Sequence, residues 1–348
     1  MTKKVSAVGL LSGGLDSMLA LRVILEQGVT VKAINCWTPF FSGFPTADTD
    51  SDPVQPNFKA LPNVLIYARS QGCEVEVIDL SDVYLQMLHN PNYGYGRNVN
   101  PCIDCHILMF RTARRIMESE SYDFVFTGEV LGQRPKSQGR QELNLIARKS
   151  GLEDRILRPL SAGILPPTLP ETEGWIDRNR LQSFRGRSRK PQMALAEQYG
   201  ITEYPTPAGG CILTDPSYAS KVRDLWKYAD KDKLSWEDYS LLRIGRHLRV
   251  NSGLKVVVGR HEAENNLLEG YVSGRTRIEP TEVPGPIVIT DESADPDQEL
   301  VAARICARYS KAGREGGEVE MRLDRDGASK LISVKAFKPE EIVDWLIR

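Results

Sequence analysis

A glycine turn near the start of the chain constrains the fold more than any other sequence feature. An apolar run over residues 5–11 leads into SGGLDS at residues 12–17, and apolar residues at helical spacing follow over residues 18–27. An apolar run, a glycine turn and an amphipathic segment are typical of a strand–loop–helix unit. The chain is therefore expected to begin with a buried strand that carries this loop to the edge of a sheet.

The same alternation of strand and helix continues through the first half of the chain. Further strands are predicted over residues 29–35, 74–78 and 123–127, and further helices over residues 57–71, 81–88 and 107–118. Strands that alternate with helices predict an α/β fold, with a doubly wound, Rossmann-like parallel sheet covered on both faces. Sheets of this kind bind ligands beyond the carboxyl ends of their strands, which is where the glycine loop is expected. Residues 39–56, rich in Pro, Asp, Ser and Thr, are interpreted as a flap over that site.

The chain is long enough for two or three domains, and its pattern changes twice. We predict a nucleotide-binding domain over residues 1–170 and a linker or helical extension over residues 171–244. Residues 245–348 are predicted to form a smaller α+β domain. Its expected strands span residues 254–258, 283–289 and 317–323, and its expected helices span residues 299–309 and 339–347.

Composition excludes several classes of protein. The sequence is 41% hydrophobic, and no apolar run approaches the roughly 20 residues of a membrane span. The apolar start is too short for a signal peptide and no cleavage pattern follows it, so a cytoplasmic protein is expected. In a reducing cytoplasm the six cysteines indicate metal binding or catalysis rather than disulfides. The formal net charge of −1 means that any nucleic acid would have to be bound by local basic patches.

The SGGLDS turn has the composition of a pyrophosphate cradle. Gly13 and Gly14 let backbone N–H groups approach an oxyanion, and Ser12 and Ser17 add hydroxyl donors beside a helix N-terminus. Asp16 is a candidate catalytic residue that could hold Mg²⁺ or water against the phosphates of ATP. The alternative is a tight turn in which Asp16 or Ser17 caps the helix.

Three cysteines form the second candidate site. Cys102 and Cys105 form a CxxC motif at a predicted helix start, and Cys211 follows a glycine turn far downstream. A helix N-terminus favours thiolates, and three thiolates can hold three irons of a [4Fe–4S] cluster. A structural zinc half-site is the alternative. His106 is then a conceivable fourth ligand, although next to Cys105 it is expected to point elsewhere on the helix. Cys36 follows the second strand and is placed near the nucleotide, whereas Cys73 and Cys306 are interpreted as core or surface residues.

Several motifs together resemble known families. The SGGxDS run resembles the PP-loop ATP pyrophosphatases, and TGEVLGQ at residues 127–133, with Ser137-Gln138 and RPL at residues 158–160, resembles the tRNA 4-thiouridine synthetases. The context of Cys102 and the presence of a third cysteine resemble the tRNA 2-thiouridylases and their iron–sulfur relatives. The resemblance implies that ATP adenylates a uridine carbonyl in tRNA, releasing pyrophosphate, and that sulfur replaces the oxygen. The nucleotide-binding residues then include Asn35, Cys36, Thr127, Gly128 and Gln133.

Two further segments are candidates for RNA binding. A basic run contains six cations within thirteen residues, namely Arg178, Arg180, Arg185, Arg187, Arg189 and Lys190. Such a run can follow a phosphate backbone, although most basic runs are solvated faces. Residues 256–266 resemble part of the RNA-binding domain of NFACT-type proteins, which assigns RNA contacts to Arg260 and Asn265. The alternative there is a strand and a capped helix with ordinary surface charges.

Other functions remain open at this point. One is a PP-loop enzyme that acts on a small molecule, and another is a nucleotide-regulated RNA-binding protein with a structural zinc. A third keeps the sulfur chemistry but replaces the cluster with a persulfide and disulfide cycle of Cys102 and Cys211. The expected partners are tRNA and a sulfur donor, either inorganic sulfide or a desulfurase, with no membrane. A homodimer is one candidate assembly.

Overall fold

The protein divides into two compact units, with the division between Cys211 and Ile212. The computed structural model describes residues 4–41, 63–204, 211–251, 253–292 and 294–348. The segment 171–244, which the sequence analysis sets apart, is shared: its first part belongs to the first unit and its second part to the second. Most of the expected flap over residues 39–56 lies outside the described residues. No helix in the described ranges combines the length and apolarity needed to cross a membrane.

The first unit is built on a parallel sheet of five strands in the order β3-β2-β1-β4-β5. Its strands are β1 (Ser6–Leu10), β2 (Thr30–Trp37), β3 (Glu74–Asp79), β4 (Phe124–Thr127) and β5 (Ile156–Leu157). The central strand β1 pairs in parallel with β2 on one side and with β4 on the other. The predicted parallel α/β fold is confirmed.

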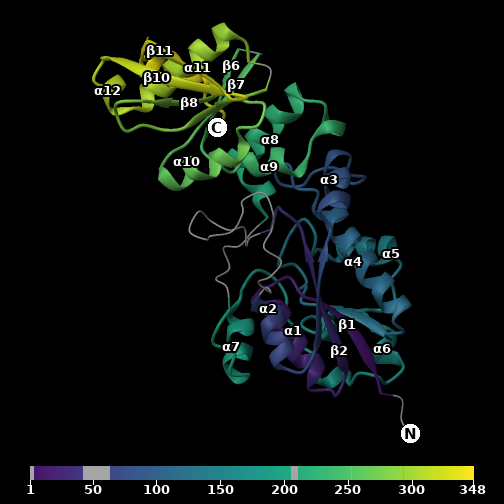
Figure 1. The fold of residues 1–348 in the computed structure, drawn as a ribbon. Helices are drawn as coiled ribbons and strands as arrows, with labels where there is room; N and C mark the ends of the chain where they lie inside the picture. Colours follow the sequence, from purple (N-terminus) through teal and green to yellow (C-terminus); the bar gives the residue numbers. More distant parts are fainter. Residues whose placement is uncertain (1–3, 42–62, 205–210, 252, 293) are drawn as a thin grey trace. The chain divides into compact units, whose positions relative to one another are not determined.

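Helices cover both faces of this sheet (Figure 1). The α-helices of this unit, among the described residues, are α1 (Leu15–Leu25), α2 (Asn63–Ser70), α3 (Ser81–His89), α4 (Cys102–Ser119), α5 (Arg140–Ser150), α6 (Leu169–Thr172) and α7 (Lys190–Gln198). Helices α1, α2 and α7 pack on one face, and α4 and α5 pack on the other. Successive residues of β1 point to opposite faces, so Ala7 is buried in one core and Val8 in the other.

The strand order places the candidate site. The chain moves outward from β1 through β2 to β3, then returns to place β4 on the other side of β1. Between β1 and β4 the connections therefore leave in opposite directions, and the loops that follow these two strands flank a crevice at the carboxyl edge. The SGGLDS loop follows β1, and the loop that begins at Gly128 follows β4.

The second unit is an antiparallel sheet of six strands in the order β11-β10-β8-β9-β7-β6. Its strands are β6 (Arg246–Val250), β7 (Leu254–Val258), β8 (Arg277–Pro280), β9 (Val288–Thr290), β10 (Glu318–Arg325) and β11 (Ala328–Lys335). Its helices are α8 (Pro216–Tyr228), α9 (Trp236–Leu241), α10 (Glu262–Leu268), α11 (Pro296–Tyr309), α12 (Lys311–Arg314) and α13 (Pro339–Ile342). Helix α11 packs against the sheet through a core that includes Ala302 and Cys306. The predicted smaller α+β unit is confirmed, although the expected strand over residues 283–289 is confined to the short β9.

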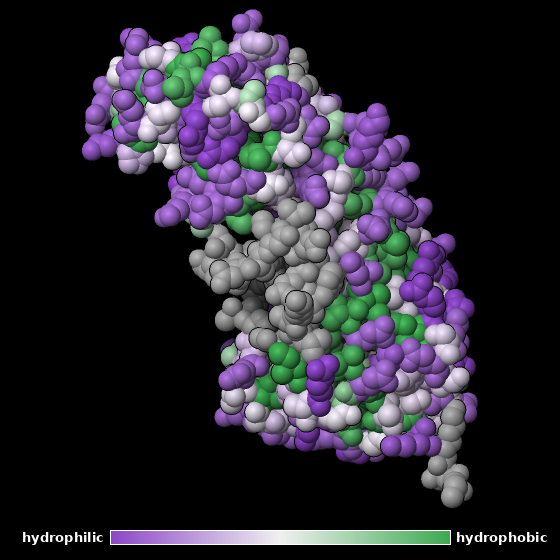
Figure 2. All heavy atoms as spheres, viewed as in Figure 1, coloured by the Kyte–Doolittle hydropathy of each residue, from purple (hydrophilic) through white to green (hydrophobic). Residues whose placement is uncertain are grey.

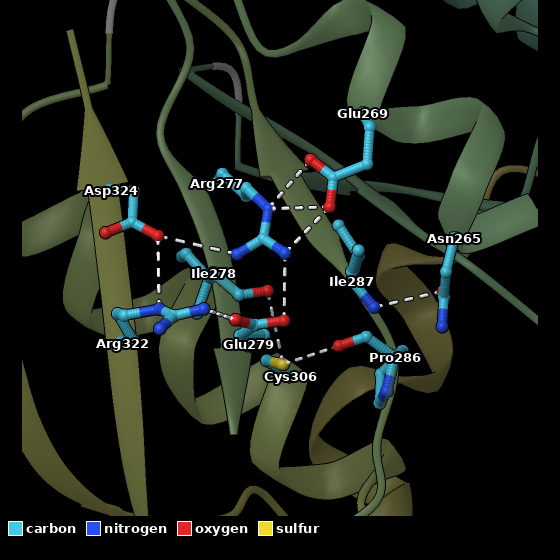
Figure 3. A network of polar contacts seen from close by, with 10 residues as sticks. All are labelled: Asn265, Glu269, Arg277, Ile278, Glu279, Pro286, Ile287, Cys306, Arg322 and Asp324. Atoms are coloured by element: carbon cyan, nitrogen blue, oxygen red, sulfur yellow. Dashed lines mark hydrogen bonds and ion pairs between the residues drawn. The ribbon is translucent and has the colours of Figure 1, made fainter. Parts of the chain in front are cut away.

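Charged side chains on β8 and β10 form a connected network in the second unit (Figure 3). Arg277 pairs with Glu269, Glu279 and Asp324, and Arg322 pairs with Glu279 and Asp324. On the face of this unit seen in Figure 2, hydrophilic residues predominate. The arginines of the network are neutralised by carboxylates within the unit itself.

Candidate active site

The SGGLDS loop has the backbone geometry of an anion-binding turn. Gly13 adopts a φ of +92°, a conformation that side-chain-bearing residues rarely adopt, and Gly14 is the N-cap of α1. The Ser17 hydroxyl donates to the Gly14 carbonyl at 2.7 Å, which fixes the first turn of the helix. The N-terminus of an eleven-residue helix therefore opens onto the carboxyl edge of the sheet.

The two carboxylate oxygens of Asp16 differ in their hydrogen bonds. Its Oδ2 accepts a hydrogen bond from Gln133 Nε2 at 3.0 Å. Its Oδ1 is buried and has no hydrogen-bond partner among the described residues. A buried carboxylate oxygen without a partner is costly unless an ion or water completes it, so this atom is suited to Mg²⁺ or a bound water.

The loop after β4 closes directly on the SGGLDS turn. A Cβ at Gly128 would lie 2.6 Å from the Asp16 carbonyl carbon and from the Ser17 nitrogen, so only glycine fits there. Together with the hydrogen bond from Gln133 to Asp16, this contact brings the TGEVLGQ motif against the first loop. The two motifs, more than a hundred residues apart in sequence, form one site.

The other residues predicted to bind the nucleotide lie at or next to the ends of these strands. The Asn35 side-chain amide donates to the Leu11 carbonyl at 2.6 Å, so Asn35 holds the start of the phosphate loop. Thr127 is the buried last residue of β4 and lies opposite Leu10. Cys36 is buried, and its burial raises the pKa of its thiol to about 12, so it is a neutral thiol.

The three candidate cysteines interact with one another. Burial first, and then the neighbouring thiols of Cys211 and Cys102, raise the pKa of Cys105 well above its usual range. Cys105 is buried and its thiol interacts with the Tyr84 hydroxyl, whereas Cys102 and Cys211 are partly exposed. The helix start and the end of the glycine turn, more than a hundred residues apart, thus bring their sulfurs into one neighbourhood.

Cys102 behaves differently from Cys105. Burial opposes its ionisation, but interactions with His106 and Ser137 and the charge of Arg134 outweigh burial and lower the pKa of Cys102. Ser137 and Arg134 belong to the loop that also carries Gln133. The same loop therefore contacts both the SGGLDS turn and the cysteine pair.

His106 is a functional residue to which the sequence analysis gave little weight. We expected it to point away from its neighbour Cys105, and its thiol partner is instead Cys102, because residues 102 and 106 are one helical turn apart. Its Nδ1 lies 2.9 Å from Glu129 Oε1, and Arg158 Nε donates to the other oxygen of Glu129 at 2.9 Å. Burial disfavours the His106 cation, but the contacts to Cys102 and Glu129 prevail and raise its pKa to about 9.

This polar chain was detectable only in part from sequence. Glu129 and Arg158 both lie in motifs that the sequence analysis quotes, but their contact depends on the packing of two loops around β4. Glu129 and Arg158 are both buried, and the Arg158 Nη2 also donates to the Leu143 carbonyl at 3.3 Å. Charges buried in this way are tolerated because they are paired and hydrogen bonded.

Asp104, between the two cysteines of the CxxC motif, was also missed. Its buried carboxylate accepts hydrogen bonds at 3.0 Å from the backbone nitrogens of Asn92 and Tyr93. The loop that leads to Cys102 is thereby tied to the first turn of α4.

A metal or cluster can be tested against these residues. Cys102, Cys105 and Cys211 supply the three sulfur donors that a cubane cluster needs from a protein with one open corner, and a nearby cation would offset their mutual repulsion. Within the described parts of the chain, no group of three His, Cys, Asp or Glu side chains has the geometry of a metal site. The donor set therefore fits a cluster in chemistry, while the positions of the sulfurs would have to adjust to hold one.

Comparison with known proteins agrees with this site. Residues 3–163 match the family described as thiamine biosynthesis protein (ThiI), and residues 245–346 match the NFACT protein RNA binding domain. We refer to these two matched parts as the ThiI-type domain and the NFACT-type domain. The ThiI match contains the SGGLDS turn, the CxxC motif and the TGEVLGQ loop, which the structure brings together.

Individual relatives cover only part of the chain. The tRNA-specific 2-thiouridylase MnmA of Dehalococcoides mccartyi is 30% identical over 104 residues, 28% of this chain and 26% of that protein. The MnmA of Acetivibrio thermocellus is 28% identical over 137 residues, 37% of this chain and 36% of that protein. The chain thus spans about a quarter to a third of the length of these curated relatives.

Solved structures align more weakly. A 4-thiouridine synthetase in complex with RNA and bound ATP aligns with a TM-score of 0.35 and 22% identity, over 58% of this chain and 54% of that chain. The C-terminal part of a fibronectin/fibrinogen-binding protein from Streptococcus suis aligns with a TM-score of 0.27 and 13% identity, over 70% of this chain and 94% of that chain.

The basic run over residues 178–190 follows the ThiI-type domain in sequence, and its cations differ in their contacts. Arg178 pairs with Glu171 and donates to the Leu165 carbonyl, and Arg180 donates to the Glu26 carbonyl beyond the end of α1. These two cations therefore support the local structure. Arg185 and Arg187 are exposed, and the backbone beside them, at Gly186, donates to the Leu131 carbonyl next to the candidate site. Arg189 is partly buried and Lys190 is exposed at the start of α7.

In the NFACT-type domain, Asn265 has a structural role. Its Oδ1 accepts from the Ile287 nitrogen at 3.0 Å and occupies the space that a side chain at Gly259 would fill (Figure 3). Arg260 Nε donates to Glu264 at 2.9 Å, although the Arg260 side chain is still 47% exposed. A phosphate would have to compete with Glu264 for Arg260, so its role in RNA binding stays a prediction.

Proposed function

We propose that this protein is an ATP-dependent tRNA sulfurtransferase that adenylates a uridine carbonyl and replaces its oxygen with sulfur. One observation carries the proposal. The loop from Gly128 to Ser137 contacts the phosphate loop at Asp16 and the reactive thiol at Cys102. An adenylating site and a sulfur site on one loop are what such a transfer needs, because the activated carbon must meet sulfur before water reaches it.

The first step would take place at the phosphate loop. Backbone N–H groups around Gly13 and Gly14, with the α1 N-terminus, would hold the phosphates of ATP, and Asp16 would hold Mg²⁺ through its unused oxygen. The uridine, flipped out of its RNA, would attack the α-phosphorus through its carbonyl oxygen, and pyrophosphate would leave. Sulfur would then displace AMP from the activated carbon.

The cysteines would present that sulfur. A [4Fe–4S] cluster bound by Cys102, Cys105 and Cys211 would supply an open iron corner for an incoming sulfide. The protein itself contributes a Cys102 thiol whose ionisation His106 favours, next to the buried side chains of Cys105 and Tyr84.

A second candidate mechanism rests on the same thiolate. The lowered pKa of Cys102, beside the neutral and buried Cys105, is also what a persulfide-forming nucleophile requires. A desulfurase would transfer a sulfane sulfur to Cys102, and the terminal sulfur of this persulfide would displace AMP from the activated carbon. Cys211 would then attack the Cys102 sulfur, which releases the thiolated uridine and leaves a Cys102–Cys211 disulfide for a cellular thiol reductant to reopen. The proposed partners, in the cytoplasm, are tRNA and a sulfur donor, which is sulfide or a desulfurase for the cluster and a desulfurase for the persulfide.

Cysteine variants of the whole protein test the proposal. Cys102→Ala, Cys105→Ala and Cys211→Ala should each abolish tRNA thiolation and leave ATP binding unchanged. Cys73→Ala and Cys306→Ala serve as matched controls, because both thiols lie in hydrophobic cores. Thiolation is measured by mass spectrometry of tRNA nucleosides. Full thiolation by all three site variants would contradict the proposed sulfur site.

The absorbance of anaerobically purified protein separates the two mechanisms. A brown protein with a broad visible absorbance band that is lost in the three site variants would support the cluster. A colourless, active protein whose Cys102 is alkylated faster than Cys105 supports the persulfide. A rate of ATP turnover that does not depend on RNA would instead favour a small-molecule substrate.

A further inference from the structure

A shallow hollow between α4 and α5 of the ThiI-type domain is lined mainly by cations. The hollow measures about 380 Å³, and its lining includes Arg111, Arg114, Arg115, Arg148 and Lys149, with one acidic residue, Glu118. Arg114 and Arg115 follow Arg111 by three and four residues, which places all three arginines along one side of α4. This cluster lies outside the basic run that the sequence analysis singled out.

Most of these charges are not paired with a carboxylate among the described residues. Arg114 pairs with Glu118 at 2.7 Å. In the parts of the chain that the structure describes, no carboxylate lies within ion-pair distance of Arg111, Arg115, Arg148 or Lys149. These four side chains belong to exposed residues, in a chain whose formal net charge is −1.

Helix stability explains only part of the cluster. Arg148 and Lys149 occupy the last turn of α5, where cations interact favourably with the helix dipole, and Arg111 Nε donates to the Lys149 carbonyl at 3.1 Å. Arg114 and Arg115 do not lie in the last turn of a helix, and their charges repel those of Arg148 and Lys149. Gly151, with a φ of +74°, leaves room for Arg114, since a Cβ there would lie 2.1 Å from the Arg114 Nη1.

We propose that this hollow binds the phosphate backbone of the RNA substrate. The inference rests on the proposed function, and it adds a docking surface on the catalytic domain itself. Four of the five cations are arginines, whose planar guanidinium groups bind phosphate oxygens in a bidentate manner. An open and strongly cationic surface without aromatic or aliphatic anchors suits a phosphate backbone better than a protein interface.

The position of the hollow matches this role. Arg111 and Arg115 follow Cys102 by nine and thirteen residues on the same helix. At about 1.5 Å of rise per residue, they lie roughly 14 and 20 Å from Cys102 along the helix axis. A stem or backbone held there would be anchored on the same rigid element that carries the reactive thiol, while a flipped uridine enters the site.

Paired neutral variants test the hollow in the full chain. We would measure the affinity for a pool of unmodified tRNA transcripts over a series of NaCl concentrations. Arg111→Gln/Arg115→Gln and Arg148→Gln/Lys149→Gln should each reduce the salt slope of log affinity by about 1.4 to 1.8, since each lost phosphate contact removes about 0.7 to 0.9. Lys4→Gln/Arg69→Gln makes the same charge change at exposed residues of the same unit and should leave the slope unchanged.

Glu118→Gln adds a test in which the expected result is a gain in affinity, which a misfolded variant would not show. It removes the acid from the hollow and releases Arg114, so it should tighten tRNA binding, most at low salt. Wild-type affinity and slope in both hollow pairs would overturn the docking surface and leave the proposed function standing. Failure of the wild-type protein to bind tRNA would overturn both. Unchanged tRNA binding with slow thiolation that recovers when sulfide replaces a desulfurase would assign the hollow to an acidic protein instead.

Discussion

Individual buried charges hold the candidate site in shape. Glu129 is the clearest case, because it is buried and joins His106 on one side to Arg158 on the other. Burial opposes ionisation of Glu129, but the charge of Arg158 and the hydrogen bond from His106 outweigh burial and lower the pKa of Glu129. The carboxylate is therefore charged in the folded state and holds the two loops around β4 together.

Glu129→Gln should destabilise the ThiI-type domain by about 3 to 5 kcal/mol at neutral pH, since it leaves the buried Arg158 without a counter-charge. A carboxylate whose pKa is lowered on folding adds stability above its unfolded pKa of about 4.5 and loses it as pH falls through the folded value. The Glu129 part of the stability gap between wild type and variant should therefore be full above pH 4.5 and narrow below it. The part that comes from the His106 cation should be full below its unfolded pKa of 6.5 and fade as pH rises toward about 9. Urea unfolding across this pH range measures the gap, with the exposed Glu153→Gln as control. An equal gap at every pH would contradict the assigned charge.

Asp16→Asn should weaken Mg²⁺-dependent ATP binding without loss of stability. The substitution keeps an oxygen for Gln133 but removes the charge from the unpartnered Oδ1. Charge-assisted contacts contribute about 1.5 to 3 kcal/mol, which corresponds to roughly tenfold to hundredfold in affinity. Calorimetry with and without Mg²⁺ measures the effect. Equal losses in the two conditions would show that Asp16 does not hold the ion.

At the level of helices and strands, sequence patterns identified the first unit well and the second unit less well. Strands β1, β2 and β4 are largely apolar runs between turns, and β3 alternates acidic and apolar residues, so the sequence pattern locates all four. Helix α5 was missed because its buried side is narrow, with Leu143, Ile146 and Ala147 among charged neighbours. Strand β5 has two residues and is defined only by its pairing with β4. In the second unit, β6 and β11 carry charged and exposed residues at a sheet edge and so lack a clear apolar pattern.

The candidate site divides in the same way. SGGLDS, TGEVLGQ and the CxxC pair are local motifs, and the sequence alone predicted their importance. The contacts of Gly128 with Asp16 and of His106 with Glu129 join segments that only the strand order brings together. The role of Asp104 was equally hidden, because the amides that it binds belong to an irregular loop.

Asp104→Ala should release the loop that leads to Cys102. The carboxylate binds the amides of Asn92 and Tyr93, so its loss should cost about 2 to 3 kcal/mol locally. Hydrogen exchange at these two amides should accelerate by roughly tenfold or more, because exchange reports local opening. Asp82→Ala, at an exposed position of α3, is the control. Unchanged protection at both amides would show that the loop is held by other contacts.

At the level of the whole molecule, the boundary between the units lies upstream of the NFACT match. That match begins at residue 245, whereas the second compact unit begins at Ile212 and includes α8 and α9. Asp224 of α8 accepts two hydrogen bonds from Arg249 of β6, at 3.1 and 2.8 Å, and also pairs with Lys255 of β7. Burial and the charge of Arg249 lower the pKa of Lys255 to about 8, even though Asp224 opposes this.

A fragment of residues 212–348 should therefore fold, and a fragment of residues 245–348 should be much less stable. The shorter fragment leaves Arg249 and Lys255 without Asp224, at a cost of about 3 to 5 kcal/mol for a broken buried pair. It also exposes the core that Leu241 and Ile244 form with Val257. Asp224→Asn in the longer fragment isolates the ionic part, and Asp230→Asn, an exposed pair with Lys233, is its matched control. Equal urea midpoints for the two fragments would mean that α8 and α9 do not support the sheet, and the unit would then begin at β6.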